Sequence, residues 1–167
     1  MNLPQRKRMR LPDYDYSENA MFFITVCTQN RKKVLSEILS VGDGFPVPKL
    51  TPVGMLVESY IDKISEKYPA VKIHKHIIMP DHIHFLMSIE NSSGGTGNPS
   101  PTIDTVFAWY KYQTTKEINI FRQSTGEKFW QRSFYDHVIR NVQDFEDIWY
   151  YIETNPHRWI EKYNCEK

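Results

Sequence analysis

The sequence predicts one α+β domain with a ferredoxin-like, split βαβ arrangement, in which helices cover one face of an antiparallel sheet. Three observations predict it. The chain has 167 residues, enough for one domain with a core but short for two. Its expected elements follow in the order β, α, β, β, α, β, α. The two central strands are separated only by Met79-Pro80-Asp81, a turn signal that indicates a hairpin. We therefore treat residues 1–167 as one domain, with the second face of the sheet free to bind a ligand.

The composition excludes several classes of protein. Lys and Arg number 21 against 20 Asp and Glu, so the net charge of +1 excludes a uniformly basic nucleic-acid binder but not a local basic patch. No apolar run reaches the roughly 18–20 residues that a membrane span needs, and we read no signal peptide. The two cysteines, Cys27 and Cys165, lie far apart and are typical of a reduced protein. We expect a cytoplasmic protein that does not enter a membrane.

The first third of the chain begins with an irregular segment. Residues 1–19 show no hydrophobic period and hold a basic arm made of Arg6, Lys7, Arg8 and Arg10. Residues 20–28 are continuously apolar and predict a buried strand. A second basic run follows at Arg31, Lys32 and Lys33. Residues 42–52 contain two Gly and three Pro and predict a loop.

The middle of the chain predicts a helix followed by two strands. From Val53 to Tyr68 apolar residues recur every three or four positions, which indicates a helix with one buried face. Thr51 is a suitable N-cap with Pro52 at the first helical position, and Pro69 ends the helix. Residues 71–78 and 82–89 read as strands.

The last third of the chain supplies two more helices. Residues 91–101 form a flexible loop, and residues 102–120 have helical spacing. Residues 129–139 are aromatic and extended. Residues 142–154 predict the final helix, with Asn141 as its N-cap and Pro156 closing it.

Two histidines on one expected strand suggest half of a metal site. His82 and His84 are two residues apart, so on a strand both imidazoles point to the same face. An isolated pair of this kind is more often a chance occurrence than a ligand set, and the signal for zinc is weak. His74 and His76 form a second pair on the preceding strand. A shift of the turn by one residue would send them to the opposite face, so their role stays open.

The final helix offers a candidate nucleophile. Tyr151 lies on the flank of the apolar stripe, and Asn155 lies one turn further along the same flank. Because Pro156 disfavours helical geometry before it, we expect Asn155 in a frayed last turn with its amide oxygen turned inward. A phenol becomes useful as a nucleophile when a metal polarises the electrophile. Taken alone, Tyr151 is better explained as a boundary aromatic and Asn155 as a residue that ends the helix.

Three separated motifs carry a resemblance to a known family. MPDHIHFLM (79–87), FWQRSFYDHVIRN (129–141) and YIETNP (151–156) resemble the REP-associated tyrosine transposases, which are single-tyrosine transposases of the HUH endonuclease superfamily. Residues 6–31 also look like that family's N-terminus, so the resemblance spans nearly the whole chain. The loop at 91–101 is its least similar stretch. Related insertion-sequence transposases have Gln where this chain has Asn155, whereas the REP-associated branch has Asn.

The resemblance implies a fold, a site and a reaction. It implies a ferredoxin-like domain with an extra C-terminal helix that carries the tyrosine. His82, His84 and Asn155 match the metal ligands, and Tyr151 matches the catalytic nucleophile. The implied reaction is cleavage of single-stranded DNA with Mg²⁺ or Mn²⁺, through a 5′-phosphotyrosyl intermediate. A second 3′-OH reverses this step and transfers the strand. The implied substrate is single-stranded or hairpin DNA, and the protein acts as a homodimer or as a monomer.

Further residues are candidates for DNA binding, because the two basic runs could neutralise phosphates and the segment 130–140 combines positive or titratable groups with aromatics. They are Arg6, Lys7, Arg8, Arg10, Arg31, Lys32, Arg132, His137 and Arg140. The alternative for the basic runs is that they are solvated surface residues, and His137 could instead support the metal site.

Two other functions remain open. One is a catalytically silent module that binds hairpin or single-stranded DNA. The other is a small-molecule hydrolase that uses the four histidines.

Overall fold

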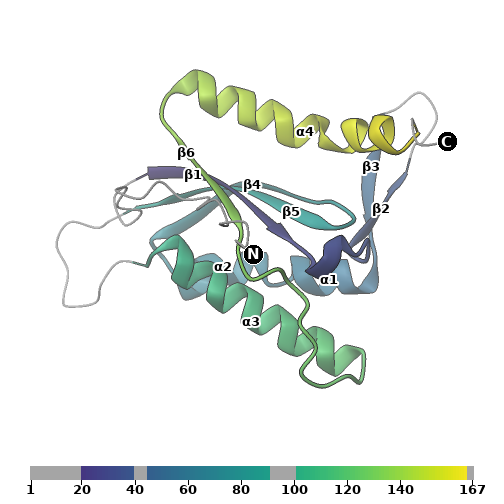
Figure 1. Ribbon diagram of the computed structural model, residues 1–167. Helices are drawn as coiled ribbons and strands as arrows, with labels where there is room; N and C mark the ends of the chain where they lie inside the picture. The colour runs from purple at the N-terminus through teal and green to yellow at the C-terminus, as the bar shows by residue number, and fades with distance from the viewer. Residues whose placement is uncertain (1–19, 40–44, 91–100, 165–167) are drawn as a thin grey trace, which may run out of the picture.

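The computed structural model describes residues 20–39, 45–90 and 101–164 (Figure 1). The predicted basic arm, with Arg6, Lys7, Arg8 and Arg10, and all but the last residue of the predicted loop at 91–101 lie outside the described residues. No helix in the described ranges is long and apolar enough to span a bilayer.

A four-stranded antiparallel sheet forms the centre of the domain. Its order is β4 (Val71–Ile78), β5 (His82–Ile89), β1 (Ala20–Cys27) and β6 (Tyr135–Ile139). The central strand β5 is buried along its whole length, although it contains His82, His84 and Ser88, because helices cover both faces of the sheet. The predicted strands at 71–78 and 82–89 are confirmed, and so is the α+β class with a split βαβ order.

The two faces of the sheet bury different side chains. Residues such as Ile83 and Phe85 of β5 join the larger core, beneath α1 (Pro52–Glu58), α2 (Ile61–Lys67) and α3 (Ile103–Phe121). The alternate residue Leu86 points to the opposite face, where α4 (Val142–Asn164) covers it with Ile152. Figure 1 shows the sheet between α4 on one side and α1, α2 and α3 on the other. The expectation that the second face is free was therefore wrong, because the helix that carries Tyr151 packs over it.

Residues 36–50 contain a hairpin that the sequence did not predict. Strands β2 (Ser36–Leu39) and β3 (Val47–Leu50) pair only with each other, and β3 lies inside the segment expected to be a loop. Their exposed residues alternate with partly buried ones, so no apolar run marks them. Pro48 is tolerated because this small sheet consists only of edge strands.

The helix expected from Val53 to Tyr68 is broken into α1 and α2. Thr51 caps α1 as predicted, since its hydroxyl accepts from the amide of Gly54 at 3.0 Å. A tighter turn interrupts the helix at Ser59, whose hydroxyl donates to the carbonyl of Leu56 at 2.7 Å. The apolar period continues through the break because both helices pack on the same core.

The final helix is longer than predicted. Asn141 caps α4 as expected, because its side-chain oxygen accepts from the amide of Asp144 at 2.8 Å. Pro156 does not end the helix but lies inside it, and the following residues reach the β2–β3 hairpin. Asn155 is therefore not frayed; it is helical and only 6% exposed. Beyond the proline the ring of Trp159 lies 6.0 Å from that of His82, so this part of the helix also lies against the sheet.

Candidate active site

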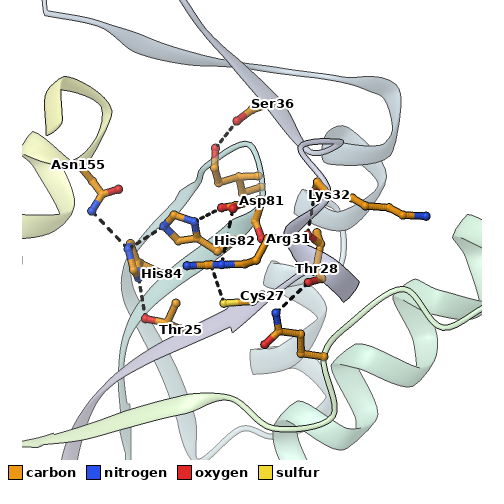
Figure 2. Close-up of polar contacts among 12 residues, drawn as sticks. Thr25, Cys27, Thr28, Arg31, Lys32, Ser36, Asp81, His82, His84 and Asn155 are labelled. Atoms are coloured by element: carbon orange, nitrogen blue, oxygen red, sulfur yellow. Dashed lines mark hydrogen bonds and ion pairs between the residues drawn. The ribbon is translucent and has the colours of Figure 1, made fainter. Parts of the chain in front are cut away.

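Two histidines of β5 converge beneath α4. Both point to the face of the sheet that α4 covers, and their Nε2 atoms lie 3.1 Å apart (Figure 2). His82 is 8% and His84 3% exposed, so both rings are shielded from water. The prediction that the two imidazoles share a face is confirmed.

The other ring nitrogen of each histidine is already engaged. Nδ1 of His82 donates to the carboxylate of Asp81 at 2.5 Å, and Nδ1 of His84 is 2.8 Å from the hydroxyl of Thr25 (Figure 2). Both Nε2 atoms are thus left for a ligand between the sheet and α4. Burial lowers the pKa of His84 well below 6.5, and the charges of His82 and Arg31 act in the same direction. The neutral imidazole that results is the form that binds metal ions.

Asn155 of α4 reaches the same point. Its amide nitrogen lies 3.4 Å from Nε2 of His84 (Figure 2), and a half turn of the amide brings its oxygen there instead. Two donors at bonds of about 2.1 Å to one octahedral ion are about 3.0 Å apart, close to the observed separation of the two Nε2 atoms. Among the described residues no group of three His, Cys, Asp or Glu side chains could hold a metal. The spacing of the two imidazoles and the amide is compatible with three ligands of one divalent cation.

Tyr151 lies against these residues. Its ring centroid is 5.4 Å from that of His84 and 5.9 Å from that of Phe23, and it meets both rings edge-on. The guanidinium of Arg158 lies 5.1 Å from the centre of the tyrosine ring. Tyr151 is half-buried, so the ring is positioned while the side chain still lines the cavity.

All these side chains line one cavity of about 800 Å³ along α4. At one end it includes His137, whose Nε2 is 2.9 Å from the carboxylate of Asp144. At the other end it includes Trp159 and Tyr163. Helical periodicity explains why residues so far apart along α4 share one surface, since Asp144, Tyr151 and Arg158 are spaced by two turns each.

The structure separates the predicted DNA-binding residues into different places. Arg31 lies in the cavity, where it donates to the sulfur of Cys27 at 2.9 Å and forms an ion pair with Asp81 at 3.7 Å. Lys32 is exposed beside it. Arg132 lines other hollows beside the 126–131 segment, and Arg140 lines a third hollow with His74.

The second pair of histidines does not join the first. A bulge between Ile73 and Lys75 changes the register of β4. His76 consequently faces Glu58 of α1 at 3.9 Å, whereas His74 contacts Ser88 at 2.8 Å. A site made of four histidines is thus absent among the described residues.

Sequence reasoning left one member of the site open and missed others. For Asp81 the sequence allows two roles, capping the turn or orienting His82, and the structure shows its carboxylate against Nδ1 of His82. Thr25 could be found only from the strand register, which pairs it with His84. Trp159 and Tyr163 are absent from the predicted site, because the helix was expected to end before them.

The geometry agrees with comparisons to known proteins. Residues 16–155 match the family model described as IS200-like transposase. The chain belongs to this transposase family. The family resemblance drawn from the three motifs is confirmed, and so is the expectation of an enzyme.

Individual relatives of this transposase agree with that assignment. The chain is 25% identical over 150 residues to a REP-associated tyrosine transposase of Escherichia coli, covering 88% of this chain and 73% of the relative. It is 27% identical over 170 residues to an uncharacterized protein of Haemophilus influenzae, covering 92% and 89%. A solved structure of a REP-associated tyrosine transposase bound to a REP hairpin superposes with a TM-score of 0.62 at 20% identity, covering 89% and 73% of the chains. That likeness confirms the transposase fold.

Proposed function

We propose that this transposase is a divalent-cation-dependent endonuclease and strand transferase for single-stranded DNA, with Tyr151 as its nucleophile. One observation carries the proposal. Residues from two separate elements, β5 and α4, bring a tyrosine ring within 5.4 Å of a histidine whose Nε2 faces a second histidine at 3.1 Å and an amide at 3.4 Å.

His82, His84 and Asn155 would hold the cation. Two imidazoles and one amide, completed by water, suit Mg²⁺ or Mn²⁺. Such an ion, when bound, withdraws negative charge from the scissile phosphate. Asp81 and Thr25 fix the orientation of the two imidazoles, so the ligands need little rearrangement.

The chain's own residues account for the covalent step. The phenolic oxygen of Tyr151 loses its proton and forms a bond to phosphorus, while the bond from phosphorus to the 3′ oxygen breaks. The products are a 5′-phosphotyrosyl DNA and a strand that ends in a 3′-OH, which takes up a proton. Attack by a second 3′-OH reverses the step and joins two strands without ATP, because one phosphodiester replaces another. Arg158 lies against the tyrosine, where its charge offsets that of the phosphate.

The substrate we propose is single-stranded or hairpin DNA, and the structural relative, which is bound to a REP hairpin, supports the hairpin. Arg31, Lys32 and His137 lie in or beside the cavity and are placed to contact the strand being cut. Arg132 and Arg140 would contact more distant parts of the DNA. Tyr151 packs on His84 of its own chain, so we propose that one copy holds a whole site, either as a monomer or within a homodimer. A role on cellular DNA implies a cytoplasmic location.

A covalent-capture gel tests the proposal. Labelled single-stranded and hairpin DNAs from the flanks of the protein's own gene are incubated with Mg²⁺ or Mn²⁺ and then denatured. We expect a metal-dependent protein–DNA band with the wild type, and none with Tyr151→Phe or with His82→Ala/His84→Ala. The matched control is Tyr150→Phe, because Tyr150 is the neighbouring tyrosine of α4 and is 62% exposed. This variant should keep the band.

Two results would contradict the proposal. A band that survives in Tyr151→Phe would assign the nucleophile elsewhere. Tight hairpin binding by all variants with no covalent band in the wild type would indicate a silent DNA-binding module.

A further inference from the structure

An aromatic pair stands at the end of the cavity, on the part of α4 that follows Pro156. Trp159 and Tyr163 are one helical turn apart, and their ring centroids are 4.5 Å apart with 45° between the planes. The ring of Trp159 also lies 6.0 Å from that of His82. Both aromatics are half-buried and line the same cavity as Tyr151. The pair therefore adjoins the candidate metal ligands directly.

Positive side chains surround this pair. The ammonium of Lys33 lies 3.6 Å from the centre of the Tyr163 ring and 5.5 Å from that of Trp159. Three further cations line the cavity: Arg31, Arg158 and Lys162. An anionic chain that enters the cavity from this end meets cations first.

The carboxylates of the cavity offset only part of this charge, since Asp81 forms an ion pair with Arg31 at 3.7 Å while Asp144 lies against His137. Asp81 is held by His82 at 2.5 Å, and Asp144 is held by His137 at 2.9 Å. Each acidic group that lines the cavity, among the residues the structure describes, is thus engaged with a histidine.

Half-buried aromatic rings beside several cations are the combination that binds single-stranded nucleic acid, since bases stack on the rings and phosphates meet the charges. We propose that Trp159 and Tyr163 form a stacking subsite for an unpaired nucleobase next to the phosphate at His82 and His84. The inference rests on the proposed function, but it concerns residues beyond the matched family segment, which ends at Asn155. It gives the C-terminal turns of α4 a role in DNA binding in addition to their role in packing.

Binding of two non-specific probes tests the subsite. One is a labelled oligothymidine of about 20 nucleotides, and the other is an abasic sugar–phosphate chain of the same length. Fluorescence anisotropy is measured in EDTA, so that no cleavage occurs. The wild type should bind oligothymidine more tightly. Trp159→Leu, which keeps apolar bulk, should weaken that binding about tenfold and leave the abasic chain unaffected. Tyr150→Leu is the control, because Tyr150 is exposed on the same helix outside the cavity lining.

Further variants keep the test independent of folding. Trp159→Phe retains a ring and should recover most of the preference for oligothymidine, and Tyr163→Leu should lose part of it. Circular dichroism checks each variant, and these two carry the test if Trp159→Leu does not fold. Equal binding of both probes by the wild type, no binding of either, or an equal loss on both probes in the variants overturns the proposal.

The subsite and the proposed chemistry can fail separately. A Tyr151 adduct in the capture gel together with no base preference removes the subsite alone. A base preference that depends on Trp159 without any adduct removes the nuclease mechanism and leaves the subsite.

Discussion

Replacing Asp81 by alanine should weaken Mn²⁺ binding at His82 and His84 and leave the fold intact. Asp81 is only 3% exposed and its carboxylate accepts from Nδ1 of His82 at 2.5 Å, so this hydrogen bond is shielded from water. Loss of such a carboxylate behind a ligating histidine lowers metal affinity by about 10- to 100-fold, or about 1.4–2.7 kcal/mol. The carboxylate of Asp81 also forms an ion pair with Arg31 at 3.7 Å, so it is not devoted to His82 alone. We therefore expect a loss of Mn²⁺ affinity near the lower limit, about tenfold. The Arg31 side chain is 53% exposed, so the substitution leaves no buried cation unpaired.

Titration calorimetry with Mn²⁺ measures this effect. The matched control is Asp144→Ala, because Asp144 also holds a histidine of the cavity, His137, but one that contacts neither His82 nor His84. The control should retain the wild-type affinity. An Asp81→Ala affinity within about twofold of the wild type, or an equal loss in Asp144→Ala, would refute the assigned ligand geometry.

Three further predictions concern the core. Gly54→Ala should lower the free energy of unfolding, measured in urea, by about 3 kcal/mol, because the added Cβ would lie 2.0 Å from the carbonyl oxygen of Leu35. An unchanged urea midpoint of unfolding would contradict this close approach. Thr114→Val should cost about 1–3 kcal/mol in the same assay, since it orphans the buried indole N–H of Trp130 that now donates to Thr114 at 2.8 Å. Burial raises the pKa of Tyr110 well above 10.0, so stability is full below about pH 10 and is lost as the pH rises through the folded-state pKa. Tyr110→Phe should flatten this alkaline decline, and an equally steep decline in the variant would contradict it.

The candidate site was only partly accessible to sequence reasoning. The spacing of His82 and His84 on a strand placed both rings on one face, and the spacing of Tyr151 and Asn155 placed both on one flank of a helix. The two histidines face Tyr151 and Asn155 because α4 crosses the second face of the sheet. Local periodicity in the sequence does not predict where a helix crosses a sheet. The position of Asn155 was inferred from a helix end that does not exist, yet its side chain reaches His84 from within the helix.

Local interactions explain what the sequence determined by itself. The caps at Thr51 and Asn141 depend on residues three positions away, and the turn signal between β4 and β5 lies in three consecutive residues, so short stretches of sequence were enough to predict them. The three motifs likewise indicate the transposase family by themselves, because each of them is a short continuous stretch of residues.

Contacts between distant segments decided the rest. The β2–β3 hairpin has no buried run of its own, and the bulge after Ile73 separates His74 and His76 only through pairing with β5. The helix continues through Pro156, and Trp159 beyond the proline lies near His82 of β5. In each case the partner lies many residues away, and only the folded chain brings the two together.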